Sequence, residues 1–143
     1  PKVPTVTADK TFEFGKAQVL TPGNDLTIIA CGIMVKSALE AAGRLKEKGL
    51  SCRVINMHTI KPIDSQAIIE AARETKGIVV CEEHTVMGGL ASAVDEIVAE
   101  NFPVKVIRIG IKNRYGQSGE PDELIKEYGL SVEDIISACG KIA

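Results

Sequence analysis

Two hydrophobic patterns alternate along this chain. Short apolar runs rich in isoleucine and valine are typical of strands that are buried on both faces of a parallel sheet. Between these runs, apolar residues recur three and four positions apart, which is typical of helices with one buried face. The predicted strands cover residues 16–20, 26–31, 51–56, 78–81 and 104–109. The predicted helices cover residues 34–48, 64–76, 89–100 and 121–128, and a last helix begins at Ser131.

The order of these elements predicts the fold class. Strands that alternate with helices of about ten residues or more need crossover connections, which are right-handed and give a mostly parallel sheet. We therefore predict an α/β fold built as a three-layer α/β/α sandwich. The last strand alternates apolar and charged residues, which places it near an edge of the sheet. Residues 1–14 are predicted to form a linker or extended arm, followed by one domain of residues 15–143.

Single residues mark where helices begin and end. Gly32 allows a sharp turn from a strand into a helix, and Gly49 is suited to end that helix. Asp64 can cap the next helix because its carboxylate can accept from the first free N–H groups.

Length and composition limit the possible functions. The chain has 143 residues, 45% hydrophobic and 25% charged, with a net charge of −2, which describes one globular domain. This charge balance offers nucleic acid no basic surface, and 3% aromatic residues without tryptophan disfavour base stacking. No apolar stretch approaches a membrane span and no signal peptide is evident. We therefore expect no nucleic-acid or membrane partner and a cytoplasmic location. Because the chain starts at Pro1 without an initiator methionine, we also expect a piece of a longer polypeptide.

The four cysteines form no metal or redox motif. None of Cys31, Cys52, Cys81 and Cys139 belongs to a C-x-x-C pair, and most lie in or beside apolar runs. A thiol in such a run behaves as a small buried hydrophobic group. This usage indicates a reducing compartment.

The stretch 77–90, GIVVCEEHTVMGGL, holds the sharpest cluster of ionisable residues. Glu82, Glu83 and His84 directly follow the predicted strand 78–81, so we expect them just past its carboxyl end. Ligands usually bind at that edge of an open α/β sheet. A carboxylate can orient an imidazole and adjust its pKa for proton transfer. The alternative is a loop whose polar groups cap the next helix or face another subunit.

Cys81 adds a second interpretation of this cluster. Neighbouring residues of a strand point to opposite faces, so Glu83 and not Glu82 is expected on the side of Cys81. Cys81 and His84 could supply half of a zinc site or a nucleophile with its base, but the chain offers no second ligand pair at zinc spacing. A buried, inert thiol is the alternative that the apolar surroundings favour.

Two further features could bind an anion. Gly88 and Gly89 precede a helix whose first N–H groups could hold a phosphate, although a tight turn explains both glycines without a ligand. No phosphate-binding glycine motif occurs in the sequence. Arg114, in the glycine-rich loop 110–119, could hold a phosphate or carboxylate by its fork of donors, or simply be solvated.

Three segments together resemble the C-terminal domain of transketolase. They read FEFGKAQVLTPGNDLTIIACG (12–32), NMHTIKPID (56–64) and CEEHTVMGGLASAV (81–94). The tail RYGQSGEPDELIKEYGL (114–130) favours transketolase over the similar domains of deoxyxylulose-phosphate synthase and of the 2-oxo acid dehydrogenase β subunit. Those two families remain alternatives. A stand-alone anion or small-molecule binding module is an alternative of another class.

This resemblance implies a fold and an activity. It implies a five-stranded, mostly parallel sheet in which strand 17–20 is antiparallel. It also implies a transferase that moves a two-carbon ketol unit between sugar phosphates in the pentose phosphate pathway, using thiamine diphosphate and Mg²⁺ or Ca²⁺. In the family those groups are held by other domains that carry a Gly-Asp-Gly motif, which this sequence lacks. We therefore expect that this chain binds neither cofactor nor metal, holds no catalytic residue and is inactive alone.

The same resemblance implies the partners. They are the thiamine-binding domains of the same enzyme, on the same or a separate chain, in a full protein that is a homodimer. With the chemistry placed in those domains, the conspicuous residues become candidates for an interface or a regulatory site. These residues are Glu83, His84, Gly88, Gly89 and Arg114.

Overall fold

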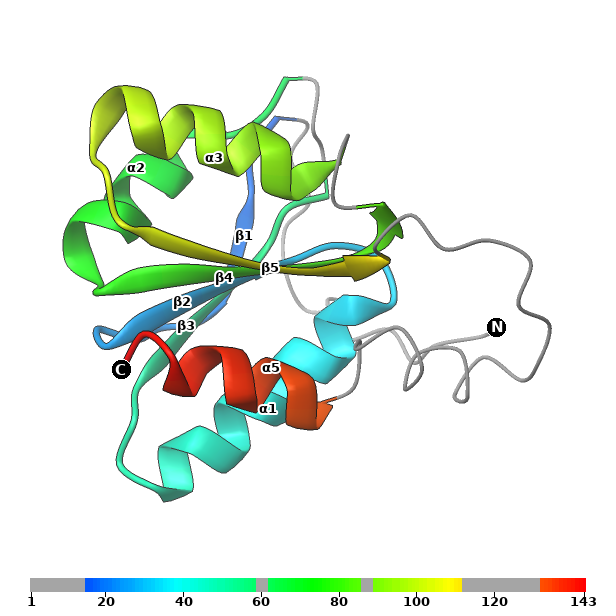
Figure 1. The fold of residues 1–143 in the computed structure, drawn as a ribbon, viewed down its shortest axis with the longest axis vertical. Helices are drawn as coiled ribbons and strands as arrows, with labels where there is room; N and C mark the ends of the chain where they lie inside the picture. Colours follow the sequence, from blue (N-terminus) through cyan, green and yellow to red (C-terminus); the bar gives the residue numbers. More distant parts are fainter. Residues whose placement is uncertain (1–14, 59–61, 86–88, 112–131) are drawn as a thin grey trace, which may run out of the picture.

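A computed structural model describes residues 15–58, 62–85, 89–111 and 132–143, and for residues 83–85 and 111 it describes the backbone only. The predicted linker 1–14 and the predicted helix 121–128 lie outside the described residues. The described elements, in chain order, are β1 (Gln18–Thr21), β2 (Leu26–Ala30), α1 (Met34–Glu47), β3 (Cys52–Asn56), α2 (Ser65–Glu74), β4 (Gly77–Thr85), α3 (Leu90–Asn101), β5 (Lys105–Ile111) and α5 (Val132–Gly140) (Figure 1).

The strands form one mixed sheet in the order β1-β3-β2-β4-β5. β1 pairs with β3 antiparallel, and the other neighbouring strands pair in parallel. The five-stranded sheet with one antiparallel strand is therefore confirmed. The prediction that the last strand lies near an edge is also confirmed, because β5 pairs with β4 at the end of the sheet.

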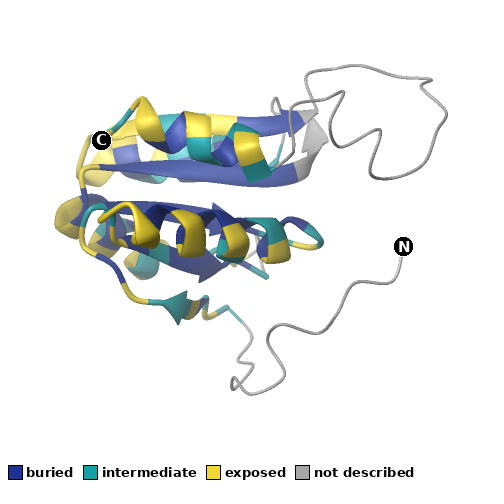
Figure 2. Cartoon of the chain, turned by 90° about the horizontal axis from the view of Figure 1, so that it is seen from below, coloured by how far each residue is buried: buried dark blue, intermediate teal, exposed yellow. Residues whose placement is uncertain are grey.

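Helices cover both faces of this sheet, as predicted for a three-layer sandwich. α1 and α5 pack on one face, and α2 and α3 pack on the other (Figure 1). Successive strand residues alternate between the two cores: Val79 packs beneath α1 and α5, whereas Val80 packs beneath α2 and α3. In Figure 2 the helices are buried along the side that meets the sheet and exposed on the outer side.

Three predicted helix signals are confirmed in the structure. Gly32 has φ +61° where β2 turns into α1, and Gly49 has φ +87° just after α1 ends. The Asp64 carboxylate caps α2 by accepting from the N–H of Ala67 at 3.1 Å. Its other oxygen accepts from the N–H of Ala17 at 2.8 Å, so the same side chain ties the chain before β1 to the start of α2.

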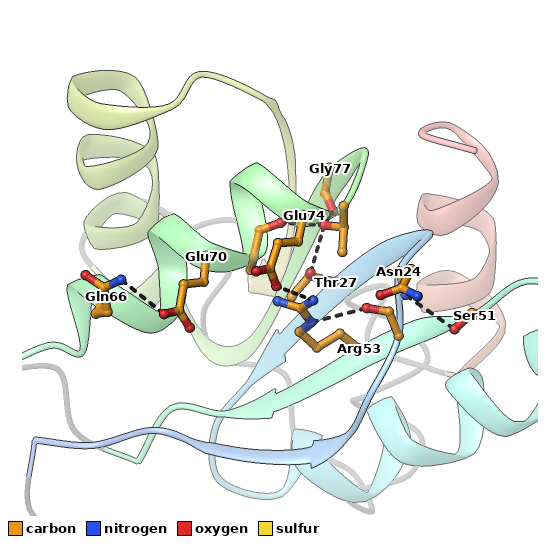
Figure 3. A network of polar contacts seen from close by, with 11 residues as sticks. Asn24, Thr27, Ser51, Arg53, Gln66, Glu70, Glu74 and Gly77 are labelled. Atoms are coloured by element: carbon orange, nitrogen blue, oxygen red, sulfur yellow. Dashed lines mark hydrogen bonds and ion pairs between the residues drawn. The ribbon is translucent and has the colours of Figure 1, made fainter.

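Polar contacts join the elements at the amino ends of the parallel strands (Figure 3). The hydroxyls of Thr27 on β2 and Thr75 at the end of α2 lie 2.9 Å apart and are buried. The Thr75 hydroxyl also donates to the carbonyl of Ala71 at 2.7 Å. Arg53 on β3 donates to the carbonyl of Gly23 at 3.2 Å and to the carboxylate of Glu74 at 2.7 Å. These contacts hold the turns at this edge against the sheet.

None of the helices within the described ranges combines the length and the apolar content needed to cross a lipid bilayer.

The position of Asp64 yields a stability prediction. Replacing Asp64 with Ala removes the acceptor for two N–H groups, so we expect a loss of about 1–2 kcal/mol in the free energy of unfolding. Asp64→Asn should lose less, because its amide oxygen can still accept from Ala67. Urea denaturation followed by circular dichroism measures both, with Glu70→Ala on the exposed face of α2 as the control. A loss in Glu70→Ala equal to that in Asp64→Ala would contradict the prediction.

Candidate functional site

The corner predicted from residues 77–90 lies at the carboxyl end of β4, but the strand is longer than the sequence pattern indicated. β4 continues beyond Cys81 to Thr85, so Glu82, Glu83 and His84 belong to the strand and do not follow it. Pairing with β5 resumes at Thr85 and Ile111 after a shift in register. The prediction was wrong because backbone hydrogen bonds to β5 extend the strand past the end of its apolar run.

Glu82 is the central residue of this corner and is completely buried. Strand alternation places it on the α2 and α3 side, because Ile78 and Val80 pack into that core and Cys81 packs into the other. One carboxylate oxygen accepts from the N–H of Leu90 at 2.9 Å, and the other accepts from the N–H of Ala91 at 2.8 Å. Glu82 therefore caps α3 from the neighbouring strand.

This cap also satisfies the electrostatics of the helix end. The first N–H groups of a helix lack partners within the helix and carry the positive end of its dipole. A carboxylate placed there supplies two charge-assisted hydrogen bonds and a compensating negative charge. The same contacts disfavour the predicted phosphate site at this helix, because Leu90 and Ala91 already donate to Glu82.

Gly89 is required by the approach of the Glu82 side chain. A Cβ atom at this position would lie 2.1 Å from Oε1 of Glu82 and 2.7 Å from its carboxyl carbon. Any other residue would push the carboxylate away from the helix it caps. This glycine therefore serves the contact between strand and helix, and its φ of −109° is not a turn conformation that requires glycine.

The other predicted site residues are only partly placed. The backbones of Glu83 and His84 lie in β4 at the carboxyl edge of the sheet, and their side chains lie outside the described part of the structure. Gly88 and Arg114 also lie outside the described residues. Within the described part of the chain, Glu82 and Gly89 are thus the members of this corner that the structure brings together.

Cys81 has the properties of a buried structural thiol. It has no exposed surface and lies in the core beneath α1 and α5. Burial, together with the nearby Cys31 and Glu82, raises the pKa of the Cys81 thiol well above its usual range. Its thiolate is therefore strongly disfavoured, which argues against the nucleophile interpretation. Searched over the described ranges, the chain holds no group of three or more His, Cys, Asp or Glu residues that could bind a metal ion.

The sequence pattern predicts helix capping only as a general alternative for this cluster and does not single out Glu82 for it. A signal was present, because alternation along 78–82 places residue 82 on the face opposite Cys81. What the pattern lacked was the position of α3 relative to that face. A strand residue can cap a helix seven or more positions away only when the turn between them returns the helix to the same side.

Comparisons with known proteins identify the relatives of this chain. The family model described as the transketolase C-terminal domain matches residues 15–135. The chain is 39% identical to a 6-deoxy-6-sulfo-D-fructose transketolase subunit of a Clostridium species, over 99% of this chain and 44% of the relative. It is 46% identical to an apulose-4-phosphate transketolase subunit of Phocaeicola vulgatus, over 93% of this chain and 43% of the relative. The chain thus spans less than half the length of these curated relatives.

Two further similarities bear on the fold and on the alternatives. A solved structure described as a split gene transketolase, inactive beta4 tetramer, is similar with a TM-score of 0.93 and 43% identity. The match covers 98% of this chain and 46% of that chain. A 1-deoxy-D-xylulose-5-phosphate synthase of Heliobacterium modesticaldum is 39% identical over 93% of this chain and 21% of the relative.

The contact between Gly89 and Glu82 can be tested with one matched pair of substitutions. Gly89→Ala should lower the free energy of unfolding by about 1–3 kcal/mol, because the new methyl group overlaps a buried carboxylate. Gly43→Ala, in the interior of α1 where a Cβ would meet nothing within 4 Å, should instead raise it by about 0.5–1 kcal/mol. Chemical denaturation measures both variants. Changes of the same sign and size would contradict the proposed role of Gly89.

Proposed function

This chain belongs to the transketolase C-terminal domain family, and we propose that it is the non-catalytic C-terminal part of an enzyme that transfers a two-carbon ketol unit between sugar phosphates. The observation that carries this proposal is the similarity to the split gene transketolase structure, with a TM-score of 0.93 at 43% identity. Relatives named as transketolase subunits support the same enzyme class.

The complete enzyme is proposed to use thiamine diphosphate with Mg²⁺ or Ca²⁺. Thiamine diphosphate supplies the electron sink for breaking and forming the carbon–carbon bond. The residues of this chain do not fit that group: the sequence has no Gly-Asp-Gly motif, and the buried carboxylate of the corner is held by two N–H groups of α3. We therefore assign no catalytic, cofactor-binding or metal-binding residue to this chain. The cofactor is assigned to other domains, on the same polypeptide or on a separate subunit.

The proposed partners are those thiamine-binding domains. A split gene relative whose beta chains alone form an inactive tetramer supports an arrangement in which activity needs a second kind of subunit. We propose that the full protein is a homodimer. We also propose that it is located in the cytoplasm. All four cysteines are thiols in the structure, which suits a reducing compartment.

The corner at the end of β4 is proposed as the contact to those domains or as a regulatory surface. β4 carries the backbone of Glu83 and His84 to the carboxyl edge of the sheet, beyond the buried core. We also assign Gly88, Gly89 and Arg114 to this proposed role, of which Gly88 and Arg114 lie outside the described residues. The hydrogen bonds of Glu82 join the strand and the helix from which this proposed surface extends.

A synthase of 1-deoxy-D-xylulose 5-phosphate is the second candidate for the complete enzyme. The observation that favours it is 39% identity to such a synthase over 93% of this chain. Relatives of the transketolase class are named for different sugars. Among the possible substrates, we propose the sugar phosphates of the pentose phosphate pathway.

Reconstitution tests the proposed division of labour. We expect the chain alone to show no heat of binding with thiamine diphosphate and Mg²⁺ in calorimetric titration, and no ketol transfer. Addition of the thiamine-binding domains of the same enzyme should allow transfer from a pentose phosphate donor, measured by mass spectrometry of the products. Tight binding of the cofactor by the chain alone would contradict the proposal. Formation of 1-deoxy-D-xylulose 5-phosphate by the complex would favour the second candidate.

Sedimentation tests the proposed assembly. The full protein should sediment as a dimer or a higher even-numbered assembly. The double substitution Glu83→Ala/His84→Ala should weaken the association of this chain with the thiamine-binding domains. Glu70→Ala, on the exposed face of α2, is the matched control. A full protein that remains monomeric at micromolar concentration would rule out the dimer.

A further inference from the structure

A cavity opens at the amino-terminal edge of the sheet, at the opposite end of the strands from the corner formed by β4 and α3. Its volume is about 410 Å³, which lies within the range of sites that bind small molecules. The end of β1, the end of α1, the segment that follows α1 and the start of β3 form its walls. Residues that line it include Thr21, Ala42, Lys46, Leu50, Ser51 and Cys52.

Backbone contacts hold the walls of this cavity in place. The N–H of Ser51 donates to the carboxylate of Asp25 at 2.6 Å, and the N–H of Asp25 donates to the carbonyl of Ser51 at 2.9 Å. The N–H of Asn24 donates to the Ser51 hydroxyl at 3.3 Å (Figure 3). The turn before β2 also packs closely on β3, because a Cβ atom at Gly23 would lie 2.3 Å from the carbonyl carbon of Cys52. The fold therefore forms the cavity before any ligand arrives.

The cavity is apolar at its floor and polar at its mouth. Ala42 and Cys52 line it with exposed fractions of 5% and 3%, so they lie at the buried end. Lys46 and Ser51 line it and are exposed, so they lie where the cavity meets solvent. The Ser51 hydroxyl accepts from Asn24 and keeps its own proton for donation to a ligand. This arrangement suits a molecule with an apolar body and one polar end.

Lys46 supplies the charge that selects the polar end of such a molecule. Among the described residues, no salt bridge involves Lys46. The negative groups nearby already have donors: the Asp25 carboxylate accepts from Ser51, and the carbonyls of Leu45 and Lys46 accept from N–H groups of residues 48–50. An anionic group at the mouth would therefore complement the Lys46 ammonium, which would repel a cation.

We propose that this cavity binds a small carboxylate with a short apolar body, such as a short-chain fatty acid. The chain fills the floor against Ala42, Leu50 and Cys52, and the carboxylate lies at the mouth beside Lys46. Burial of the chain supplies most of the affinity, because an exposed ion pair contributes little. Sugar phosphates do not suit this site, because their hydroxyls would lose hydration against an apolar floor. The proposal does not depend on the proposed function of the complete enzyme.

Titration of the 143-residue chain with hexanoate tests the site directly. In ¹H–¹⁵N correlation spectra, the amide signals of Gly49, Leu50 and Ser51 should shift saturably, with a Kd of about 1–10 mM. The amide signals of Leu90 and Ala91, at the opposite edge, should stay unchanged. Inorganic phosphate at the same concentration should cause no saturable shift. No saturable shift with hexanoate, or an equal shift with inorganic phosphate, would overturn the proposal.

The length of the acid tests the apolar floor without any change to the protein. From butyrate through pentanoate to hexanoate, the affinity should rise by about fourfold for each added methylene, which is the factor that corresponds to full burial. The melting temperature in the presence of each acid should rise in the same order, because a ligand of the folded state stabilises it. Equal affinities for the three acids would overturn the proposal.

Two lysine variants test the mouth of the cavity. Lys46→Ala should weaken hexanoate binding by about two- to fivefold, the effect expected for an exposed ion pair, and should leave the binding of uncharged hexan-1-ol unchanged. Lys48→Ala is the matched control, because Lys48 lies at the end of the same helix and outside the lining of the cavity. It should bind hexanoate as the wild type does. An equal loss in both variants would overturn the proposal.

Discussion

The hydrogen bonds between the Glu82 carboxylate and the first N–H groups of α3 are the contact on which this corner of the domain depends. A fully buried carboxylate is strongly disfavoured unless charge-assisted hydrogen bonds replace its lost hydration. Here two backbone donors and the positive end of a helix provide that replacement. The contact fixes where α3 starts and in which direction it leaves the sheet. It also explains why residue 89 is a glycine, because a Cβ atom there would overlap the Glu82 carboxylate. The contact therefore ties the start of α3 to β4, whereas α2 is held against the sheet by the apolar core it shares with α3.

Because Glu82 is a helix cap, the cluster of residues 81–84 has a different interpretation in the fold than in the sequence. A Cys, two Glu and a His in succession resemble acid–base or nucleophilic machinery when only their order is considered. In the fold, Cys81 and Glu82 point into opposite cores, one as a thiol with a raised pKa and the other as a helix cap. The chain shares its family with the C-terminal domain of transketolase. A domain whose conspicuous acid stabilises its own architecture is consistent with chemistry carried by other domains.

The two edges of the sheet have different characters. At the carboxyl edge, the Glu82 cap joins β4 to the start of α3. At the amino edge, the paired hydroxyls of Thr27 and Thr75 and the contacts of Arg53 hold the turns together. A cavity of about 410 Å³, lined by Thr21, Lys46 and Cys52 among others, also lies at that edge.

The sequence by itself determined the three-layer arrangement of strands and helices in this domain. Strand and helix periodicities are local, because each depends on a few side chains that are close together in the chain. It also determined single-residue signals such as the Asp64 cap and the turns at Gly32 and Gly49, which depend on residues close in the chain. The antiparallel direction of β1 was predicted only from the family resemblance, because the hydrophobic pattern of a strand does not depend on the direction of the strand it pairs with. Only the tertiary structure decided the length of β4 and the cap of α3 by Glu82. Each of these joins segments far apart in sequence, and hydrogen bonds between them depend on how the layers pack.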